Sequence, residues 1–170
     1  GQGVFAGAEV HGLADRGSAR PHLLGQRFGD DHLLGQVAAF VLVDVDQFLR
    51  QEVAAFAVSN HIRGLLAEKP FDVASSDRHT IKPWFTSKLP ESPAVVDLSA
   101  SGFTLVGGRV DVIAGDPVPT IVYRRGPHAI SLTTLHSVRA IPGASISGYN
   151  IRAWEIGGFT YVAVSDLPAE

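Results

Sequence analysis

Residues 149–164, Tyr-Asn-Ile-Arg-Ala-Trp-Glu-Ile-Gly-Gly-Phe-Thr-Tyr-Val-Ala-Val, predict a β-hairpin in the C-terminal part of the chain. Residues 149–156 form an alternating run rich in β-formers, and residues 159–164 form a second strand-like run. The Gly157-Gly158 pair between them is a strong signal for a tight turn. These residues therefore define the last two strands of a predicted antiparallel sheet.

Further strands are predicted upstream of this hairpin, and short turns join them. They cover residues 103–113, 118–124 and 128–135, and a loop is expected over residues 137–147. Two glycines, Gly107 and Gly108, interrupt the first of these strands and indicate a bulge or a close backbone contact. Sequential hairpins favour an antiparallel β-meander of about five strands.

A helix is predicted over residues 47–68, because apolar residues recur there at approximately helical spacing and Pro70 then ends it. We expect this N-terminal helix to cover one face of the meander, which gives an α+β fold. Recurring glycines weaken any long helix before it, so residues 1–50 are expected to be a poorly defined N-terminal segment. The folded domain is then residues 51–170. Pro83 is expected to make residues 81–89 irregular.

The composition excludes several classes of function. The chain has 170 residues and no cysteine, so it has about one domain, no disulfide and no thiolate zinc site. A formal net charge of −3 without a basic block argues against nucleic-acid binding. Charged residues separate the apolar runs 37–43 and 53–58, so no transmembrane helix is expected, and no signal peptide is expected either.

Motifs for catalysis, metals and cofactors are weak. Ser75-Ser-Asp-Arg-His79 contains serine, aspartate and histidine, but a helix cap with local turn bonds is the better interpretation of so compact a segment. The seven histidines show no metal-ligand spacing. Residues 102–108 lack the ending of a phosphate loop. We therefore expect no enzyme activity, no metal and no cofactor.

A polar and aromatic surface is the best candidate site for a ligand or partner. Its predicted members are His79, Lys82, Trp84, Arg124, Arg125 and His128. Adjacent guanidinium groups such as Arg124 and Arg125 can bind an anion, although such a pair also fits a solvated strand end. Trp84 fits either a partner surface or the edge of a core.

Five segments carry a joint sequence pattern: residues 72–89 (DVASSDRHTIKPWFTSKL), 102–111 (GFTLVGGRVD), 122–128 (VYRRGPH), 148–154 (GYNIRAW) and 158–167 (GFTYVAVSDL). Taken together and in this order, they resemble the extracytoplasmic domain of bacterial membrane-bound anti-sigma factors, the predicted transmembrane transcriptional regulators. The resemblance covers roughly residues 52–170. Each motif alone is weak, whereas the combination is specific.

The resemblance implies a regulatory, non-catalytic sensor domain that controls an extracytoplasmic-function sigma factor. The family places a cytoplasmic zinc-binding domain first, which holds the sigma factor, then one transmembrane helix, and then this outer domain. This portion is thus expected to be periplasmic, at the inner membrane of a bacterium. The sigma factor and the membrane would be contacted through parts absent from this sequence. Residues 1–50 do not resemble the zinc domain, and one hypothesis is that they come from a wrong start or reading frame.

Two other functions are compatible with the sequence. The chain can be a stand-alone small-ligand or anion-binding module that uses Arg124 and Arg125 near the sheet edge. A hydrolase that uses Ser76, Asp77 and His79 is the weakest alternative.

Overall fold

The computed structural model describes residues 30–136 and 143–168, with side chains from residue 47 onward. The chain divides into two compact units, Gly1–Val37 and Ala38–Glu170, and within the first only the beginning of helix α1 is described. In chain order the elements are α1 (Asp30–Leu66), β1 (Val73–Ala74), α2 (Arg78–Thr86), a short 3₁₀ helix (Ser99–Ser101), β2 (Thr104–Ile113), β3 (Asp116–Arg125), β4 (His128–His136), β5 (Ala144–Ile146), β6 (Tyr149–Ile156) and β7 (Phe159–Ser165).

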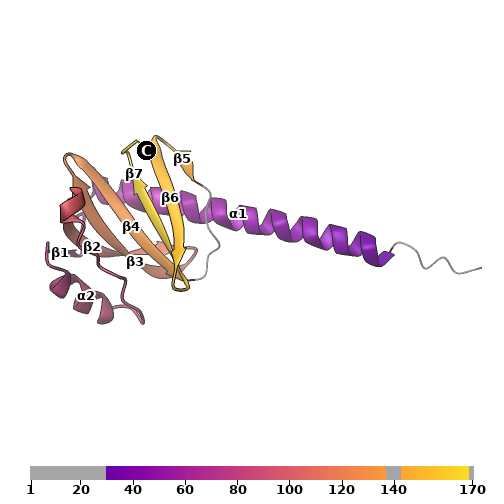
Figure 1. The fold of residues 1–170 in the computed structure, drawn as a ribbon, viewed down its shortest axis with the longest axis horizontal. Helices are drawn as coiled ribbons and strands as arrows, with labels where there is room; N and C mark the ends of the chain where they lie inside the picture. Colours follow the sequence, from indigo (N-terminus) through magenta and orange to yellow (C-terminus); the bar gives the residue numbers. More distant parts are fainter. Residues whose placement is uncertain (1–29, 137–142, 169–170) are drawn as a thin grey trace, which may run out of the picture. The chain divides into compact units, whose positions relative to one another are not determined.

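The strands form one antiparallel sheet in the order β1-β2-β3-β4-β7-β6-β5 (Figure 1). The α+β class is confirmed, but the described sheet has seven strands, where about five were expected. The two additional strands, β1 and β5, are two and three residues long, too short for a recognisable pattern. β4 is followed in the sheet by β7, so the simple meander ends at β4.

The predicted hairpin of β6 and β7 is confirmed. It pairs Ile156 with Phe159 across the Gly157-Gly158 turn. Gly157 and Gly158 have φ angles of 62° and 82°, a left-handed conformation that glycine adopts without steric cost. Both glycines therefore allow the tight turn that the sequence predicted.

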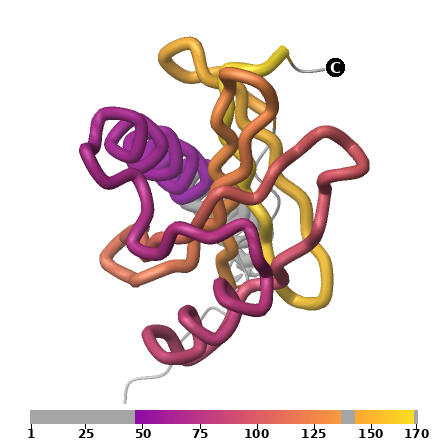
Figure 2. The backbone as a smooth tube through the Cα atoms, turned by 90° about the vertical axis from the view of Figure 1, so that its left-hand side faces the viewer, coloured from indigo at the N-terminus to yellow at the C-terminus, as the bar shows by residue number. Residues whose placement is uncertain are grey.

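A helix covers part of each face of the sheet, and a separate apolar core lies under each helix (Figure 2). The first core joins α1 to the sheet through Val53, Ala54, Ala57, Val58, Ile113, Val118, Leu135, Ile151, Val162 and Val164. The second core joins α2 and the segment before β2 to the opposite face through Ile81, Phe85, Leu89, Leu105, Ile121 and Tyr123. The expectation that the N-terminal helix covers one face is thus confirmed.

Both helices differ from the prediction in their bounds. α1 begins at Asp30, so the expected start at residue 47 is wrong. Only two glycines, Gly35 and Gly64, lie within α1, and the cost of about 1 kcal/mol for each is small enough for a long helix to absorb. The irregular conformation expected around Pro83 is also wrong, because α2 continues through it. Burial of Ile81 and Phe85 and a cap at Asp77 hold this helix in place despite the proline.

The two glycines in β2 have distinct structural roles. The β2–β3 register shifts between Leu105 and Gly107, which confirms the predicted bulge. A Cβ atom at Gly107 would lie 2.6 Å from the backbone oxygen of Val73. A Cβ atom at Gly108 would lie 2.8 Å from the buried ring of Phe85. The predicted close backbone contact is therefore present at Gly107, where β1 pairs with β2.

Gly107→Ala is expected to lower the free energy of unfolding by about 1–3 kcal/mol, because the new methyl group displaces β1 from β2. Urea denaturation followed by circular dichroism measures this loss. Thr104→Ala, at an exposed position of the same strand, is the control and should change stability little. Equal stability of Gly107→Ala and the unmodified protein would show that this contact is not tight.

Candidate functional site

A polar network, buried except for the exposed Arg63 side chain, joins the C-terminal part of α1 to the sheet. It consists of His61 and Arg63 from α1, Arg109 and Asp111 from β2, and Ser131 from β4, and is called the polar clamp below. Arg109 Nε donates to both carboxylate oxygens of Asp111 at 3.0 Å, and Arg63 also forms an ion pair with Asp111. Arg109 and Asp111 are 4% and 1% exposed, so this is a fully buried charge pair.

The clamp reaches α1 through both side chains and backbone. Arg109 Nη2 donates to Ser131 Oγ at 3.1 Å and to the backbone oxygen of Asn60 at 3.2 Å. Ser131 Oγ shares a 2.8 Å hydrogen bond with His61 Nδ1. Gly64 allows the guanidinium to lie against the helix, since a Cβ atom there would be 2.7 Å from Arg109 Nη1. The buried charges therefore fix the helix at one position and rotation on the sheet.

His61 is neutral at physiological pH in this arrangement. Burial lowers its pKa from 6.5 to about 4, and the positive charge of Arg109 adds to the effect. The ring is 2% exposed and contacts Tyr149 edge-on, with 4.9 Å between ring centroids. Protonation of His61 would put a second positive charge beside Arg109, so acid weakens the clamp.

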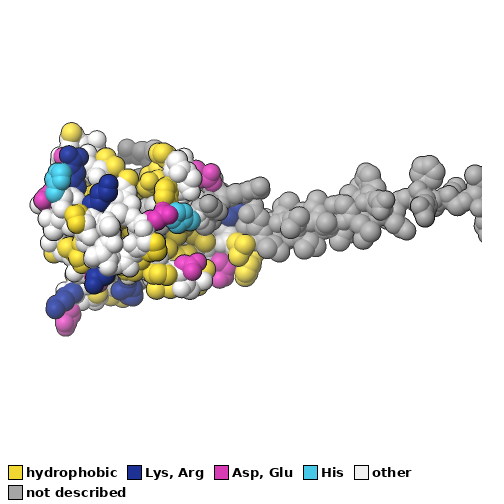
Figure 3. All heavy atoms as spheres, turned by 90° about the horizontal axis from the view of Figure 1, so that it is seen from below, with side chains coloured by type: hydrophobic (Ala, Val, Ile, Leu, Met, Phe, Trp, Pro, Cys, Tyr) yellow, Lys and Arg dark blue, Asp and Glu magenta, His cyan; other side chains and the backbone are white. Residues whose placement is uncertain are grey.

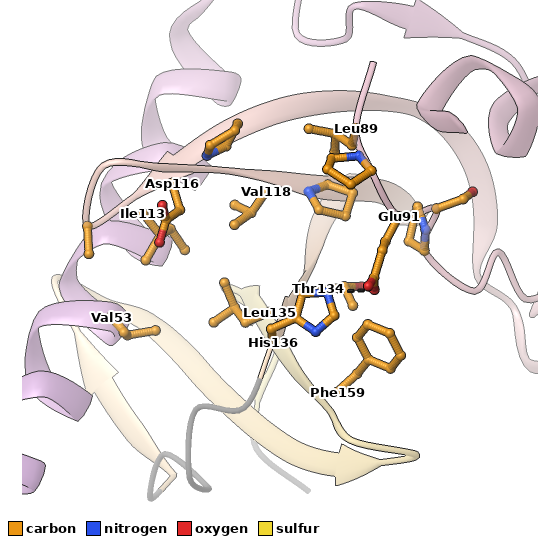
Figure 4. Close-up of a pocket in the computed structure, with 16 residues that line it drawn as sticks. Val53, Leu89, Glu91, Ile113, Asp116, Val118, Thr134, Leu135, His136 and Phe159 are labelled. Atoms are coloured by element: carbon orange, nitrogen blue, oxygen red, sulfur yellow. Dashed lines mark ion pairs between the residues drawn. The ribbon is translucent and has the colours of Figure 1, made fainter. Parts of the chain in front are cut away.

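A second feature is an apolar cavity of about 500 Å³ at the end of the sheet where β3 and β4 separate (Figure 4). Val118 of β3 and Leu135 of β4 point into it, and Val53 of α1 lies at its edge. His136 and Glu91 form an ion pair beside it. The space-filling view in Figure 3 shows hydrophobic side chains near a neighbouring acidic and histidine side chain on one face. The volume is in the range of small-molecule sites.

The residues predicted as a ligand or partner surface lie on two parts of the fold. His79 and Lys82 line one hollow beside α2. Trp84 is half-buried on the same helix and contacts Phe85 edge-on, with 5.0 Å between centroids, which fits the edge of the second core. No described hydrogen bond or ion pair joins these residues to Arg124, Arg125 or His128, so one continuous surface stays a prediction.

The other three predicted residues lie around the β3–β4 turn. Arg125 and His128 are opposite each other across the hairpin, and the Arg125 guanidinium lies 5.2 Å from the centroid of the Phe103 ring. The His128 Nδ1 atom is 2.9 Å from the Asp166 carboxylate, and this hydrogen bond lowers the pKa of Asp166. Arg124 is exposed at the edge of a small cavity of about 100 Å³ that Arg109 also lines.

The Ser-Asp-His segment forms a helix cap. Asp77 is the N-cap residue of α2, and its Oδ1 accepts from the His79 backbone N–H at 2.8 Å. Ser75 Oγ accepts from the Asp77 backbone N–H at 3.0 Å. The expected cap with local turn bonds is therefore confirmed. No hydrogen bond between the Ser76 and His79 side chains is found in the described segment.

The described residues contain neither a cluster of metal ligands nor a helix that could cross a membrane. Within residues 47–136 and 143–168, no three histidine, aspartate or glutamate side chains gather as a metal site would require. No helix in the described part of the chain combines the length and apolar character needed to cross a membrane.

No family model, curated protein or solved structure matches this chain. The candidate sites therefore stand on their own geometry and on the sequence motifs.

Sequence reasoning missed both the polar clamp and the cavity. Arg109 and Asp111 are two residues apart in a predicted strand, so they share a face, and two charges on one face of an apolar strand were the available signal. Pro117 and Pro119 in β3 were the signal for the cavity, because proline cannot donate to a strand ladder. Pairing these residues with partners on α1 and β4 required the tertiary structure.

Proposed function

We propose that this chain is the regulatory sensor domain of a membrane-bound anti-sigma factor and is not an enzyme. The joint motifs of residues 72–167 support this proposal through their resemblance to that family. The single structural observation that carries the proposal is the polar clamp. The clamp makes α1 part of the sheet domain and couples the position of α1 to the state of the sheet. A sensor needs one element whose state changes with the rest of the domain.

The proposed mechanism is thermodynamic linkage. A signal that binds the sheet domain better in one arrangement of α1 than in another shifts the population of the two arrangements. Since α1 is the first described helix, it connects the sheet domain to the N-terminal part of the chain. In the family order of parts, that chain leads to the transmembrane helix and to the sigma-binding domain. The domain is then periplasmic, and release of the sigma factor depends on α1.

Deletion of the gene in the bacterium that carries it tests this function. We expect the transcripts that depend on one extracytoplasmic-function sigma factor to rise several-fold, because the sigma factor is no longer held. Sequencing of total RNA measures the change, and a plasmid copy of the gene should reverse it. A transcript profile that is unchanged by deletion contradicts the proposal.

A second candidate function is a stand-alone small-ligand module, and the cavity between β3 and β4 is the observation that favours it. The anion-binding form of this alternative depends on Arg124 and Arg125. The exposed position of both side chains fits an anion site and a solvated strand end equally well.

A further inference from the structure

The cavity between β3 and β4 exists because prolines interrupt the pairing of the two strands. The β3–β4 ladder runs from Arg125 opposite His128 to Thr120 opposite Thr133 and stops there. A two-residue turn closes this hairpin, and the closing pair of such a hairpin is hydrogen-bonded. Every second residue of β3, counted from Arg125, therefore directs its backbone N–H and C=O toward β4.

Continued along β3, this alternation places Pro119 and Pro117 at the next two positions that face β4. Both positions need an N–H to continue the ladder, and proline has none. Their expected partners on β4 are Thr134 and His136, and all four residues line the cavity. The alternation directs the backbone N–H and C=O groups of Thr134 and His136 into the gap, and the prolines supply no N–H donor for these two C=O groups. At the cavity, the edge of β4 therefore lacks the hydrogen-bonding partners that β3 provides along the rest of the ladder.

The Thr134 side chain adds an independent sign of a missing partner. Its residue is only 6% exposed, and its buried Oγ1 atom makes no hydrogen bond to any described residue. A buried hydroxyl without a partner costs free energy, so such groups in native proteins call for an explanation. The neighbouring Thr133 on the opposite face is satisfied, with its Oγ1 2.9 Å from Thr120 Oγ1.

We propose that this cavity binds a neutral, compact and largely apolar molecule that carries one carbonyl or hydroxyl group. The lining of Val53, Leu89, Ile113, Val118, Leu135, Phe159 and several prolines supplies the apolar surface. The Thr134 hydroxyl has no partner among the described residues and can donate a hydrogen bond to a carbonyl or hydroxyl oxygen of the bound molecule. The Asp116 carboxylate also lines the cavity and disfavours an anion.

This inference rests on the proposed function, since it names the kind of molecule that the sensor would detect. Val53 belongs to α1 and to the cavity lining, so an occupant contacts the helix directly. Val53 also belongs to the core that holds α1 on the sheet. Binding at this position therefore acts on the same helix as the polar clamp.

Prodan, 6-propionyl-2-(dimethylamino)naphthalene, is a suitable probe because it is neutral and apolar, carries one carbonyl group and changes its fluorescence in apolar surroundings. We expect saturable binding of prodan to the full 170-residue chain. The methyl NMR signals of Val118 and Leu135 should shift on binding. Thr134→Val, which keeps the side-chain shape, should raise the Kd about five- to tenfold through loss of one hydrogen bond.

Thr133→Val is the matched control. It removes a hydroxyl one residue away on the opposite face, so it should lower the urea midpoint and leave the prodan Kd unchanged. The analogue without the carbonyl, N,N-dimethyl-2-naphthylamine, should bind Thr134→Val and the unmodified chain equally. Absence of saturable binding, methyl shifts confined to other residues, or an unchanged Kd in Thr134→Val would each overturn the inference.

These outcomes are distinguishable from failure of the proposed function. Prodan binding is measured on the purified chain, whereas the proposed function is measured by transcripts after gene deletion. Binding with unchanged transcripts overturns the anti-sigma proposal and with it the role of the occupant as a signal. Altered transcripts without binding overturn the inference about this cavity alone.

Discussion

Replacing Asp111 with alanine is expected to lower the free energy of unfolding by about 3–5 kcal/mol, because it leaves Arg109 buried without its counter-charge. Arg63 loses its ion-pair partner in the same variant. Among the described residues, the Arg109 guanidinium then keeps only the Asn60 backbone oxygen and the Ser131 hydroxyl as hydrogen-bond acceptors. Urea denaturation followed by circular dichroism measures the loss.

The double variant Arg109→Met with Asp111→Leu is the control for this prediction. It removes both buried charges and keeps apolar volume, so it should recover most of the stability lost in Asp111→Ala. A loss below about 1 kcal/mol in Asp111→Ala would mean that the ion pair is not as buried as the structure places it. A double variant as unstable as the single one would show that packing, and not charge, dominates here.

The second large effect is a loss of stability in acid that His61 causes. In the folded state burial lowers the pKa of His61 from 6.5 to about 4. Between these values the unfolded chain binds a proton that the folded chain does not, so stability falls as the pH falls. The contribution of His61 is fully present above pH 6.5 and decreases by about 3 kcal/mol by pH 4.

Urea denaturation at a series of pH values from 7 to 4 measures this dependence. His61→Phe is the control, because phenylalanine can keep the edge-on contact with Tyr149 and cannot titrate. In this interval, the slope of the unfolding free energy against pH should be smaller in the variant by the contribution of about one bound proton. The same pH dependence in the variant and the unmodified protein would assign the acid sensitivity to other groups.

The sequence predicts the sheet best where alternation and turn residues agree. The expected strand over residues 149–156 has the bounds of β6, since a strict pattern and a Gly-Gly turn both specify it. The expected helix over 47–68 ends close to Leu66 but begins too late, because recurrent glycine in residues 1–50 suggested a boundary that α1 does not have. Statements about residues 1–29 lie outside the described residues.

The candidate sites are less predictable because their partners are distant in sequence. His61 meets Ser131 only after α1 packs across β4. The missing partner of Thr134 follows from prolines on a different strand, and nothing in the residues next to Thr134 shows it. Local patterns thus predict elements, whereas these sites depend on the register between elements.

The most direct test of the central claim, that the polar clamp ties α1 to the state of the sheet, is hydrogen–deuterium exchange of the Ser131→Ala variant. This substitution removes the hydroxyl that contacts both His61 and Arg109. Ser165→Ala is the matched control, because its hydroxyl bonds the backbone of Ala129 and not α1. We predict that backbone amides of residues 53–66 exchange at least about tenfold faster in Ser131→Ala, while those of α2 keep their rates. Equal exchange of α1 in Ser131→Ala and Ser165→Ala would contradict the account.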